Sequence, residues 1–279
     1  MDKLVSIIIP CYNDASFIEQ AIDSAFSQTY ANKEIIVVDD GSNTETKNII
    51  KSVQSKIDIL ITQQNKGVCI ARNNAIERAK GEYILTLDAD DFFEPSFLEK
   101  AVDILNKRSN VGMVTCYVNV ITVKNNTSYV LKPSGTNDTE PLYYNNSMGS
   151  CLYRKSIWQE VEGYDENLKE GFEDWEFNIA ISKKGWMVHV IAEILFNYRI
   201  KPTSRNQSAK NYQKKIRRYV FLKHSDIAET NFEKTLDFFL DEIEMLRRLI
   251  HAQQNTASFR IGHFFVKLGK PILSIFKKK

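Results

Sequence analysis

The first half of the chain alternates short apolar runs with longer amphipathic runs. The short runs have the length of buried strands, and the amphipathic runs repeat their apolar residues at three-and-four spacing, as helices do. A repeated strand and helix order predicts a mostly parallel sheet with right-handed crossover connections. The predicted strands are residues 4–9, 34–38, 57–62 and 82–87, and the predicted helices are residues 15–28, 44–53 and 68–79.

The pattern changes after residue 110. Residues 111–123 and 128–132 flank Asn125-Asn126 as the arms of a hairpin would, and the polar residues 133–147 predict a long loop. A loop of this length without structure of its own is usually functional or disordered. The remaining runs predict helices at 154–161 and 172–183 and strands at 186–191 and 194–199.

Residues 230–254 predict a separate helix, because their apolar positions step alternately by four and three like the seam of a coiled coil. The seam has two interpretations: the helix packs back on the preceding domain, or copies of the chain associate through it. The seam residues are Phe232, Leu236, Phe239, Ile243, Leu246 and Ile250.

Residues 259–276 predict a basic amphipathic helix of the kind that lies on a membrane surface. Gly262, Gly269 and Pro271 would break it into short pieces, which leaves a disordered tail or a core helix as alternatives. Its basic positions are Arg260, His263, Lys267 and Lys270, opposite Ile261, Phe264, Phe265, Leu268 and Ile272.

Charge is distributed very unevenly along an otherwise ordinary composition. The 279 residues are 43% hydrophobic and 26% charged, which excludes a wholly disordered chain. The net charge of +2 conceals a contrast, because residues 1–200 carry 20 basic and 28 acidic side chains whereas residues 201–279 carry 17 and 7. The basic tail indicates an anionic partner. We favour a membrane surface and expect no nucleic-acid partner, because no nucleic-acid-binding motif accompanies the charge.

The cysteines and the apolar runs indicate the cellular compartment in which we expect the protein. The four cysteines form no Cys-x-x-Cys pair, so we expect buried thiols in a reducing compartment. The apolar opening ends at Pro10 and lacks a cleavage site, so we expect no signal peptide. No apolar run approaches the ~18 residues of a membrane span. These features predict a cytoplasmic protein that is soluble or peripheral to a membrane.

Carboxylates gather at the predicted strand ends, where parallel sheets bind their ligands. Asp39 and Asp40 follow the second strand, and Asp88, Asp90 and Asp91 follow the fourth. The dinucleotide fingerprint, the phosphate loop and the His-Glu-x-x-His zinc helix are absent from the sequence, which excludes dehydrogenases and phosphate-loop NTPases.

The second acidic cluster predicts a metal site. Three carboxylates within four residues repel one another, and Mg²⁺ or Mn²⁺ would offset their charge. The alternative is a solvated acidic turn near Glu94-Pro95-Ser96 that caps the next helix.

Neighbouring residues fit a bound nucleotide. Asp39 could accept hydrogen bonds from a base or a sugar hydroxyl, and Asn65-Lys66-Gly67 with Arg72-Asn73 could meet phosphates through amides and positive charge. The alternative is a simple turn at Gly67 and a surface arginine at position 72.

Five motifs follow one another along the chain. They are Ile9-Pro10-Cys11-Tyr12-Asn13, Val38-Asp39-Asp40-Gly41-Ser42, Asn65-Lys66-Gly67 with Arg72-Asn73, Leu87-Asp88-Ala89-Asp90-Asp91, and Glu173-Asp174-Trp175. Each motif alone is common, but in this order they resemble the family-2 inverting glycosyltransferases, which have a GT-A fold. The resemblance covers residues 1–200.

The resemblance implies roles in donor binding. Pro10, Tyr12 and Asp39 would hold the nucleoside, Asp88 would contact the ribose, and Asp90 would coordinate the metal, Mn²⁺ or Mg²⁺. Asp91 would support them less directly. The full donor-binding set that we expect is Pro10, Tyr12, Asp14, Asp39, Asn65, Lys66, Gly67, Arg72, Asp88 and Ala89.

The resemblance also implies that Glu173-Asp174 provides the catalytic base. An acceptor hydroxyl has a pKa far above 7, so a carboxylate that takes its proton accelerates attack by roughly 10²- to 10⁴-fold. We assign the base to Asp174 and the orientation of the acceptor to Glu173. The same residues could also be first-turn acids that complement a helix dipole. Tyr198-Arg199 and Ser204-Arg205 would fold over the diphosphate or lie at the surface.

We therefore predict an α/β protein with a GT-A domain at residues 1–205 and a helical extension at 206–279. Within the domain, residues 1–110 would bind the nucleotide and residues 111–205 would form the acceptor and catalytic half. The predicted activity is the metal-dependent, inverting transfer of a sugar from a nucleotide-sugar, for which we favour a UDP-sugar, to a glycan or lipid-linked glycan. We expect this reaction at the inner face of the membrane, in the synthesis of a cell-surface polysaccharide. The alternatives are a non-catalytic scaffold and nucleotidyl transfer to a sugar phosphate. The second would require an amino-terminal glycine-rich loop, whereas the sequence after Ile9 is Pro10-Cys11-Tyr12-Asn13.

Overall fold

The computed structural model describes residues 2–125, 127–136, 141–201 and 212–276, and their side chains up to residue 266. The chain divides into two compact units, Met1–His224 and Ser225–Lys279. Helix α8 (Gln213–Lys223) therefore belongs to the first unit, whereas the sequence assigned it to the extension. The boundary predicted at residue 205 lies outside the described residues.

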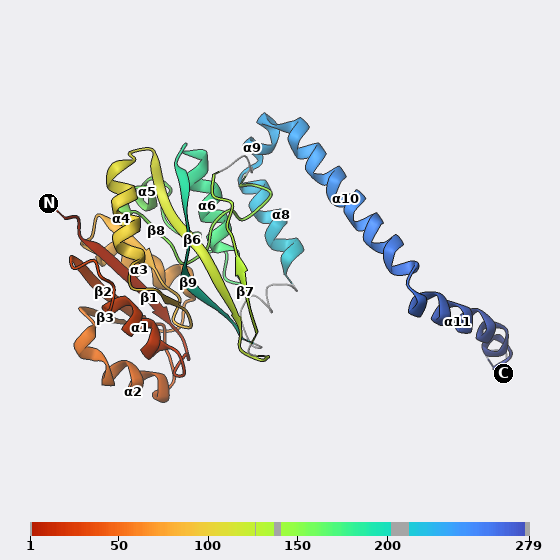
Figure 1. The fold of residues 1–279 in the computed structure, drawn as a ribbon, viewed down its shortest axis with the longest axis horizontal. Helices are drawn as coiled ribbons and strands as arrows, with labels where there is room; N and C mark the ends of the chain where they lie inside the picture. Colours follow the sequence, from red (N-terminus) through yellow and green to blue (C-terminus); the bar gives the residue numbers. More distant parts are fainter. Residues whose placement is uncertain (1, 126, 137–140, 202–211, 277–279) are drawn as a thin grey trace. The chain divides into compact units, whose positions relative to one another are not determined.

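A nine-stranded sheet forms the centre of the first unit (Figure 1). Its strand order is β3-β2-β1-β4-β8-β6-β9-β5, with β7 paired to β6. The first four strands are parallel to their neighbours, and β6 is parallel to β9, while β8 runs antiparallel between β4 and β6. The strands are β1 (Val5–Cys11), β2 (Lys33–Asp39), β3 (Ile59–Thr62), β4 (Tyr83–Thr86), β5 (Phe92–Phe93), β6 (Val111–Thr122), β7 (Thr127–Leu131), β8 (Leu152–Arg154) and β9 (Met187–Ile200).

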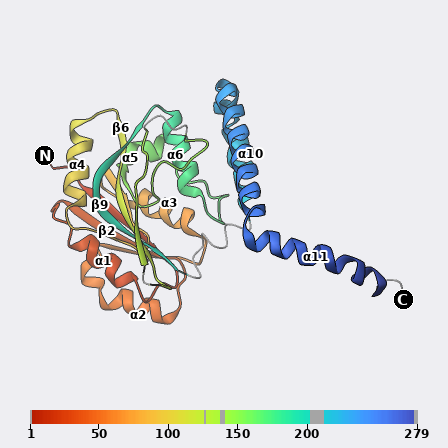
Figure 2. The ribbon, with the colours of Figure 1, turned by 45° about the vertical axis from the view of Figure 1, so that its right-hand side comes forward.

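Helices cover both faces of this sheet. One buried cluster contains residues of α1, α2 and α4, and the other contains residues of α3, α5 and α6. Figure 2 shows the long strands β6 and β9 running side by side between these layers. The helices are α1 (Ile18–Phe26), α2 (Thr44–Ser52), α3 (Val68–Arg78), α4 (Phe97–Lys107), α5 (Lys155–Glu160) and α6 (Glu173–Lys183), and a 3₁₀ turn, η1, spans Gln54–Lys56.

The continuous apolar runs form strands because both faces of the sheet are buried. Successive side chains of a strand point to opposite faces, so Ile7 and Ile9 enter one cluster while Ile8 enters the other. Alternation of polar and apolar residues is therefore unnecessary in these strands.

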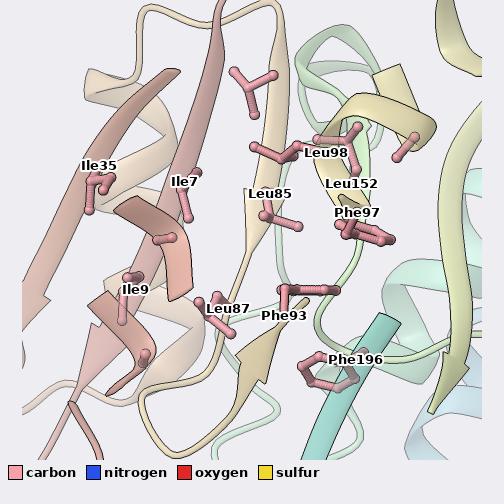
Figure 3. Close-up of a cluster of buried hydrophobic side chains, with 14 of the residues drawn as sticks. Ile7, Ile9, Ile35, Leu85, Leu87, Phe93, Phe97, Leu98, Leu152 and Phe196 are labelled. Atoms are coloured by element: carbon pink, nitrogen blue, oxygen red, sulfur yellow. The ribbon is translucent and has the colours of Figure 1, made fainter. Parts of the chain in front are cut away.

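Aromatic packing fixes the edge strand β5, which directly follows the second acidic cluster in the chain. Phe93 of β5 lies against Phe97 of α4 and Phe196 of β9, with ring centroids 4.3 and 4.6 Å apart (Figure 3). This contact anchors the chain directly after Asp90 and Asp91, and so positions the turn that carries them.

Several elements differ from the sequence prediction. The hairpin of β6 and β7 is confirmed, but the two strands predicted at 186–191 and 194–199 form one strand, β9, with irregular register against β6. Strands β5 and β8 were not predicted, and helix α8 was predicted only as part of the helical extension. Each gives a weak pattern, since β5 and β8 have two and three residues and α8 buries only Ile216 and Val220.

The second unit consists of α9 (Ser225–Thr230), α10 (Phe232–Gln254) and α11 (Ala257–Phe276). Continuous helix through Gly262, Gly269 and Pro271 contradicts the expected break of α11 into short pieces. Within the described part of the chain, no helix combines the length and the hydropathy that a membrane span requires.

Candidate active site

A cavity of about 570 Å³ lies at the carboxyl ends of the parallel strands. Its wall comes from the end of β1, the turn after β4, the loop before α3 and the end of β9. This is the edge where parallel sheets bind ligands. The predicted donor-binding residues that line it are Pro10, Tyr12, Asp14, Asn65, Gly67, Asp88 and Ala89, and the predicted metal ligand Asp90 lines it as well.

The first acidic cluster shapes the cavity in a way that the sequence did not predict. Asp40, rather than Asp39, lines it. The Asp40 carboxylate accepts hydrogen bonds from the backbone amides of Lys66 and Gly67, both at 2.9 Å. Asp39 is buried, and its Oδ1 accepts a hydrogen bond from the amide of Ser42 at 2.8 Å. Nucleoside contact by Asp39 stays a prediction.

Glycine is required where these loops meet. Gly41 has φ +78°, and a Cβ on it would lie 2.7 Å from the amide nitrogen of Asn65. Only glycine combines this left-handed conformation with so close an approach. The loop before α3 is therefore held against the turn after β2. Lys66 is exposed and does not line the cavity, so phosphate binding by its side chain stays a prediction.

Arg72 is buried, although one interpretation of the sequence placed it at the surface. Its side chain is 1% exposed, which contradicts the surface alternative. Its Nη2 lies 2.5 Å from Oδ1 of Asp88, and its Nη1 lies 2.9 Å from Oε1 of Glu173. The guanidinium also lies 5.3 Å from the ring centroid of Tyr164. One buried cation therefore joins the two acidic motifs, while phosphate contact by Arg72 stays a prediction.

A lysine that the sequence did not single out enters the cavity beside Asp90. The Lys201 ammonium lies 2.8 Å from Oδ2 of Asp90 and 2.5 Å from Oδ1 of Asp14. Burial and the neighbouring Asp88 raise the pKa of Asp90, and the lysine opposes that rise. The only signal in the sequence is a cationic residue directly after the last strand.

Asp91 fastens the acidic turn to strand β9. It is buried, and its Oδ1 accepts a hydrogen bond from the amide of Arg199 at 2.7 Å. Burial and the charges of Asp90 and Asp88 raise the pKa of Asp91 well above its usual value. Helix α4 instead begins after Ser96, whose side chain makes no capping hydrogen bond, so the structure does not support the helix-capping alternative.

Tyr198 and Arg199 line the cavity, and their contact with a diphosphate stays a prediction. The Arg199 guanidinium donates a hydrogen bond to the backbone oxygen of Asp90, and it lies 4.7 Å from the ring centroid of Phe92. Ser204-Arg205 lies outside the described residues.

The acidic turn fits a divalent cation. Asp88 and Asp90 both face the cavity, and carboxylate oxygens are the ligands that Mg²⁺ and Mn²⁺ prefer. Among the residues whose positions are described, no three His, Cys, Asp or Glu side chains are grouped to hold a metal. Such sites commonly use one or two carboxylates and complete the shell with substrate phosphates and water.

The Glu173-Asp174 pair begins helix α6. Phe172, just before it, has φ +65°, a left-handed conformation that costs a bulky residue about 1–3 kcal/mol. Backbone strain of this kind is concentrated at functional sites. Glu173, Asp174 and Glu176 are also the acids of the first helical turn, so they complement the helix dipole at the same time.

Asp174 has the environment of a general base. Its Oδ2 accepts a hydrogen bond from Nδ2 of Asn145 at 2.8 Å, and Oδ1 of Asn145 accepts one from Nδ2 of Asn178 at 2.7 Å. Burial, followed by the charge of Glu173, raises the pKa of Asp174. A carboxylate with a raised pKa is a stronger proton acceptor at neutral pH. Asn145 comes from the predicted long loop, and periodicity carried no signal for it.

The family described as Glycosyl transferase family 2 matches residues 6–161 of this sequence. The chain belongs to this family. An uncharacterized glycosyltransferase of Rickettsia prowazekii is 36% identical over 219 residues, which cover 75% of this chain and 67% of the relative. TuaG of Bacillus subtilis, named for teichuronic acid biosynthesis, is 36% identical over 117 residues, 41% of this chain and 46% of TuaG. Chondroitin synthase of Escherichia coli is 30% identical over 196 residues, 67% of this chain and 28% of the synthase.

Solved structures confirm the predicted GT-A fold of this family-2 glycosyltransferase. Staphylococcus aureus TarS in complex with UDP-GlcNAc matches with a TM-score of 0.63 and 20% identity, over 74% of this chain. TarS in complex with UDP matches with a TM-score of 0.58 over 71% of this chain. The present chain spans 61% of the length of both TarS chains.

The structure brings the sequence motifs of this family member into two adjoining places. One is the cavity, and the other is the start of α6. They adjoin at Gly149, where an added Cβ would lie 3.8 Å from both Nη2 of Arg72 and Oδ2 of Asp174. The sequence therefore indicated the acidic motifs and Arg199, but it did not indicate that Lys201 lies in the same cavity.

Proposed function

We propose that this family-2 glycosyltransferase moves a sugar from a UDP-sugar to a hydroxyl of a glycan or lipid-linked glycan during synthesis of a cell-surface polysaccharide. The observation that carries the proposal is the buried Arg72, which joins Asp88 at the cavity to Glu173 beside the base. The relatives named for teichuronic acid and chondroitin, and the UDP-GlcNAc complex of TarS, support the substrate class.

The cavity suits a nucleotide-sugar in size and charge. Its volume of about 570 Å³ lies within the roughly 300–1,000 Å³ of common ligand sites. Tyr12 lines the cavity and is half exposed, so its ring is available to stack on the nucleobase of the donor. Lys169, Arg199 and Lys201 line the same cavity and would attract a diphosphate.

Asp88 and Asp90 would hold Mn²⁺ or Mg²⁺ together with the diphosphate of the donor. When bound, the cation would supply positive charge against the negative charge of the diphosphate leaving group.

Asp174 then acts on the acceptor. Its carboxylate takes the proton of the acceptor hydroxyl while the hydroxyl oxygen forms a bond to the anomeric carbon of the donor sugar. The bond between that carbon and the diphosphate breaks, and the nucleoside diphosphate leaves. Attack from the face opposite the leaving group inverts the anomeric configuration. Asn145 holds the proposed base by a hydrogen bond to its Oδ2.

A donor screen tests this proposal. The full chain is incubated with a panel of UDP-sugars and Mn²⁺, and release of UDP is measured with and without candidate acceptors. We expect one donor to be hydrolysed slowly without acceptor, and Asp90→Ala to weaken UDP binding. If no donor reacts and Asp90→Ala binds UDP as the wild type does, the proposed site is wrong.

We further propose that α11 brings the enzyme to the inner face of the membrane. The apolar residues Phe264, Phe265 and Val266 of α11 are each at least 59% exposed, and anionic lipids attract basic side chains by ~1 kcal/mol each. The full chain should therefore sediment with vesicles that contain anionic lipid, less so at high salt, and not with neutral vesicles. Deletion of residues 255–279 should abolish binding; a deleted chain that still sediments would contradict the proposal.

A further inference from the structure

Helix α10 carries a long apolar stripe at the surface of the second unit. Its six seam residues are each between 43% and 67% exposed, which is unusual for such large apolar side chains in regular positions along one helix. They are Phe232, Leu236, Phe239, Ile243, Leu246 and Ile250. An exposed stripe of this regularity marks an interaction surface.

The spacing of the stripe assigns heptad positions. Leu236, Ile243 and Ile250 occupy the a positions, and Phe232, Phe239 and Leu246 occupy the d positions. In parallel coiled coils, isoleucine at a with leucine at d favours two strands over three or four. Two of the three a residues are isoleucine, and the last d residue is leucine.

The charged positions beside the stripe distinguish the two possible orientations. Glu242 falls at g, and Arg247 falls at e of the next heptad, five residues later. In a parallel pair, g of one helix meets e of the following heptad in the other helix, so Glu242 faces Arg247 twice by symmetry. In the antiparallel pair that aligns the same seam, Arg247 meets Glu233 of the other copy, but Glu242 faces a second Glu242. The parallel pair is therefore the one without a like-charge contact.

We propose that α10 joins two copies of this chain as a parallel two-stranded coiled coil. The occupant of the apolar stripe is thus the same stripe of a second copy, with the Glu242 and Arg247 pairs setting its direction. This inference stands on α10 alone and is independent of the proposed glycosyl transfer. In a parallel pair the two helices α10 end at the same end, so both copies of α11 begin there, and two amphipathic helices can bind one surface together.

Sedimentation of the full chain at micromolar concentration tests the association. We expect a dimer whose dissociation constant rises on the order of 10-fold or more in Glu242→Arg and in Arg247→Glu, because each creates two like-charge pairs. The double exchange Glu242→Arg with Arg247→Glu should restore the dimer. Arg248→Glu, at the exposed f position of the same helix, is the matched control and should leave the dimer intact.

Several outcomes would overturn the inference. A monomer indicates that the stripe packs within its own chain, and a trimer or tetramer contradicts two strands. A dimer that tolerates both single exchanges contradicts the charge pairs. Circular dichroism of each variant shows whether a loss of the dimer reflects loss of helix.

Engineered cysteines test the direction separately. Ile250→Cys should form an intermolecular disulfide with itself under mild oxidation, because a positions face each other in a parallel pair. The antiparallel pair would instead cross-link a mixture of Leu236→Cys and Leu246→Cys chains, and that result would overturn the proposed direction. The four natural cysteines are buried, and the wild type provides the background.

Discussion

Arg72 is a buried positive charge held by carboxylates on two sides. It contacts Asp88 at the cavity and Glu173 at the start of α6, so it links the proposed donor site to the element that carries the proposed base. A buried cation between two acids contributes little net stability as a unit, but removing one member leaves an uncompensated buried charge.

Arg72→Met should destabilise the protein strongly. Glu173 would remain buried without its cation, which costs about 3–5 kcal/mol of unfolding free energy. Urea denaturation followed by circular dichroism measures the change. Arg78→Met, at an exposed position of the same helix, is the control and should shift stability by no more than about 0.5 kcal/mol. Equal midpoints for the two variants would contradict the bridging role of Arg72.

Asn145 contacts Asp174, the proposed base, through one hydrogen bond. Asp174 must be unprotonated to act, and burial, followed by the charge of Glu173, raises its pKa. As the pH is lowered, activity should therefore begin to fall at a pH above the ordinary pKa of an aspartate. The hydrogen bond from Asn145 lowers that pKa. Asn145→Ala should therefore move the acid limb of the pH profile of kcat to higher pH.

The same variant should lower kcat about tenfold, the worth of one hydrogen bond to a charged group, with little change in the KM for the donor. Asn125→Ala, an exposed asparagine of the β6 and β7 hairpin, should match the wild type. An unchanged acid limb in Asn145→Ala would show that Asn145 does not act on the base.

At the scale of elements, β9 completes the cavity. It runs parallel to β6 along its whole length, and this pairing brings Arg199 and the following Lys201 to the acidic turn. The Lys201 ammonium lies against both Asp14 and Asp90, and so it would compete with a divalent cation for Asp90.

Lys201→Met should therefore tighten the binding of Mn²⁺ several-fold in the absence of donor. Binding is measured by electron paramagnetic resonance of free Mn²⁺ during titration. Lys107→Met, an exposed lysine of α4 paired with Asp103, should bind Mn²⁺ as the wild type does. Weaker binding in Lys201→Met would mean that the lysine does not occupy the cation site.

The strands of the first half were predictable because burial on both faces leaves continuous apolar runs, as in Ile7 to Ile9. Strands β5 and β8 were not predictable, since two or three residues contain no period and their pairing is set by neighbours distant in sequence. The same limit applied to the site. Asp88, Asp90 and Asp174 stand in recognisable motifs, whereas Asn145 and Lys201 reach the site only through tertiary packing.

At the scale of the whole molecule, the excess of acidic side chains lies in residues 1–200 and the excess of basic side chains lies in residues 201–279. The acidic side chains of the first unit include those at the cavity and at the start of α6, which fit a cation and a diphosphate. The cysteines are buried as predicted, and burial raises the pKa of Cys11, Cys116 and Cys151 to about 12, so these thiols are unreactive. Within the second unit, the basic helix α11 bears on where the enzyme works, and the apolar stripe of α10 bears on what it associates with.

The most direct test of the central claim compares Asp174→Asn with the wild type on the donor found in the screen. Donor affinity is measured by calorimetry, and turnover is measured by release of UDP in the presence of acceptor. We expect the same donor affinity and a loss of turnover of roughly 10²- to 10⁴-fold, because only proton transfer from the acceptor is removed. Retained turnover in Asp174→Asn would contradict the assignment of the base, and with it the proposed mechanism.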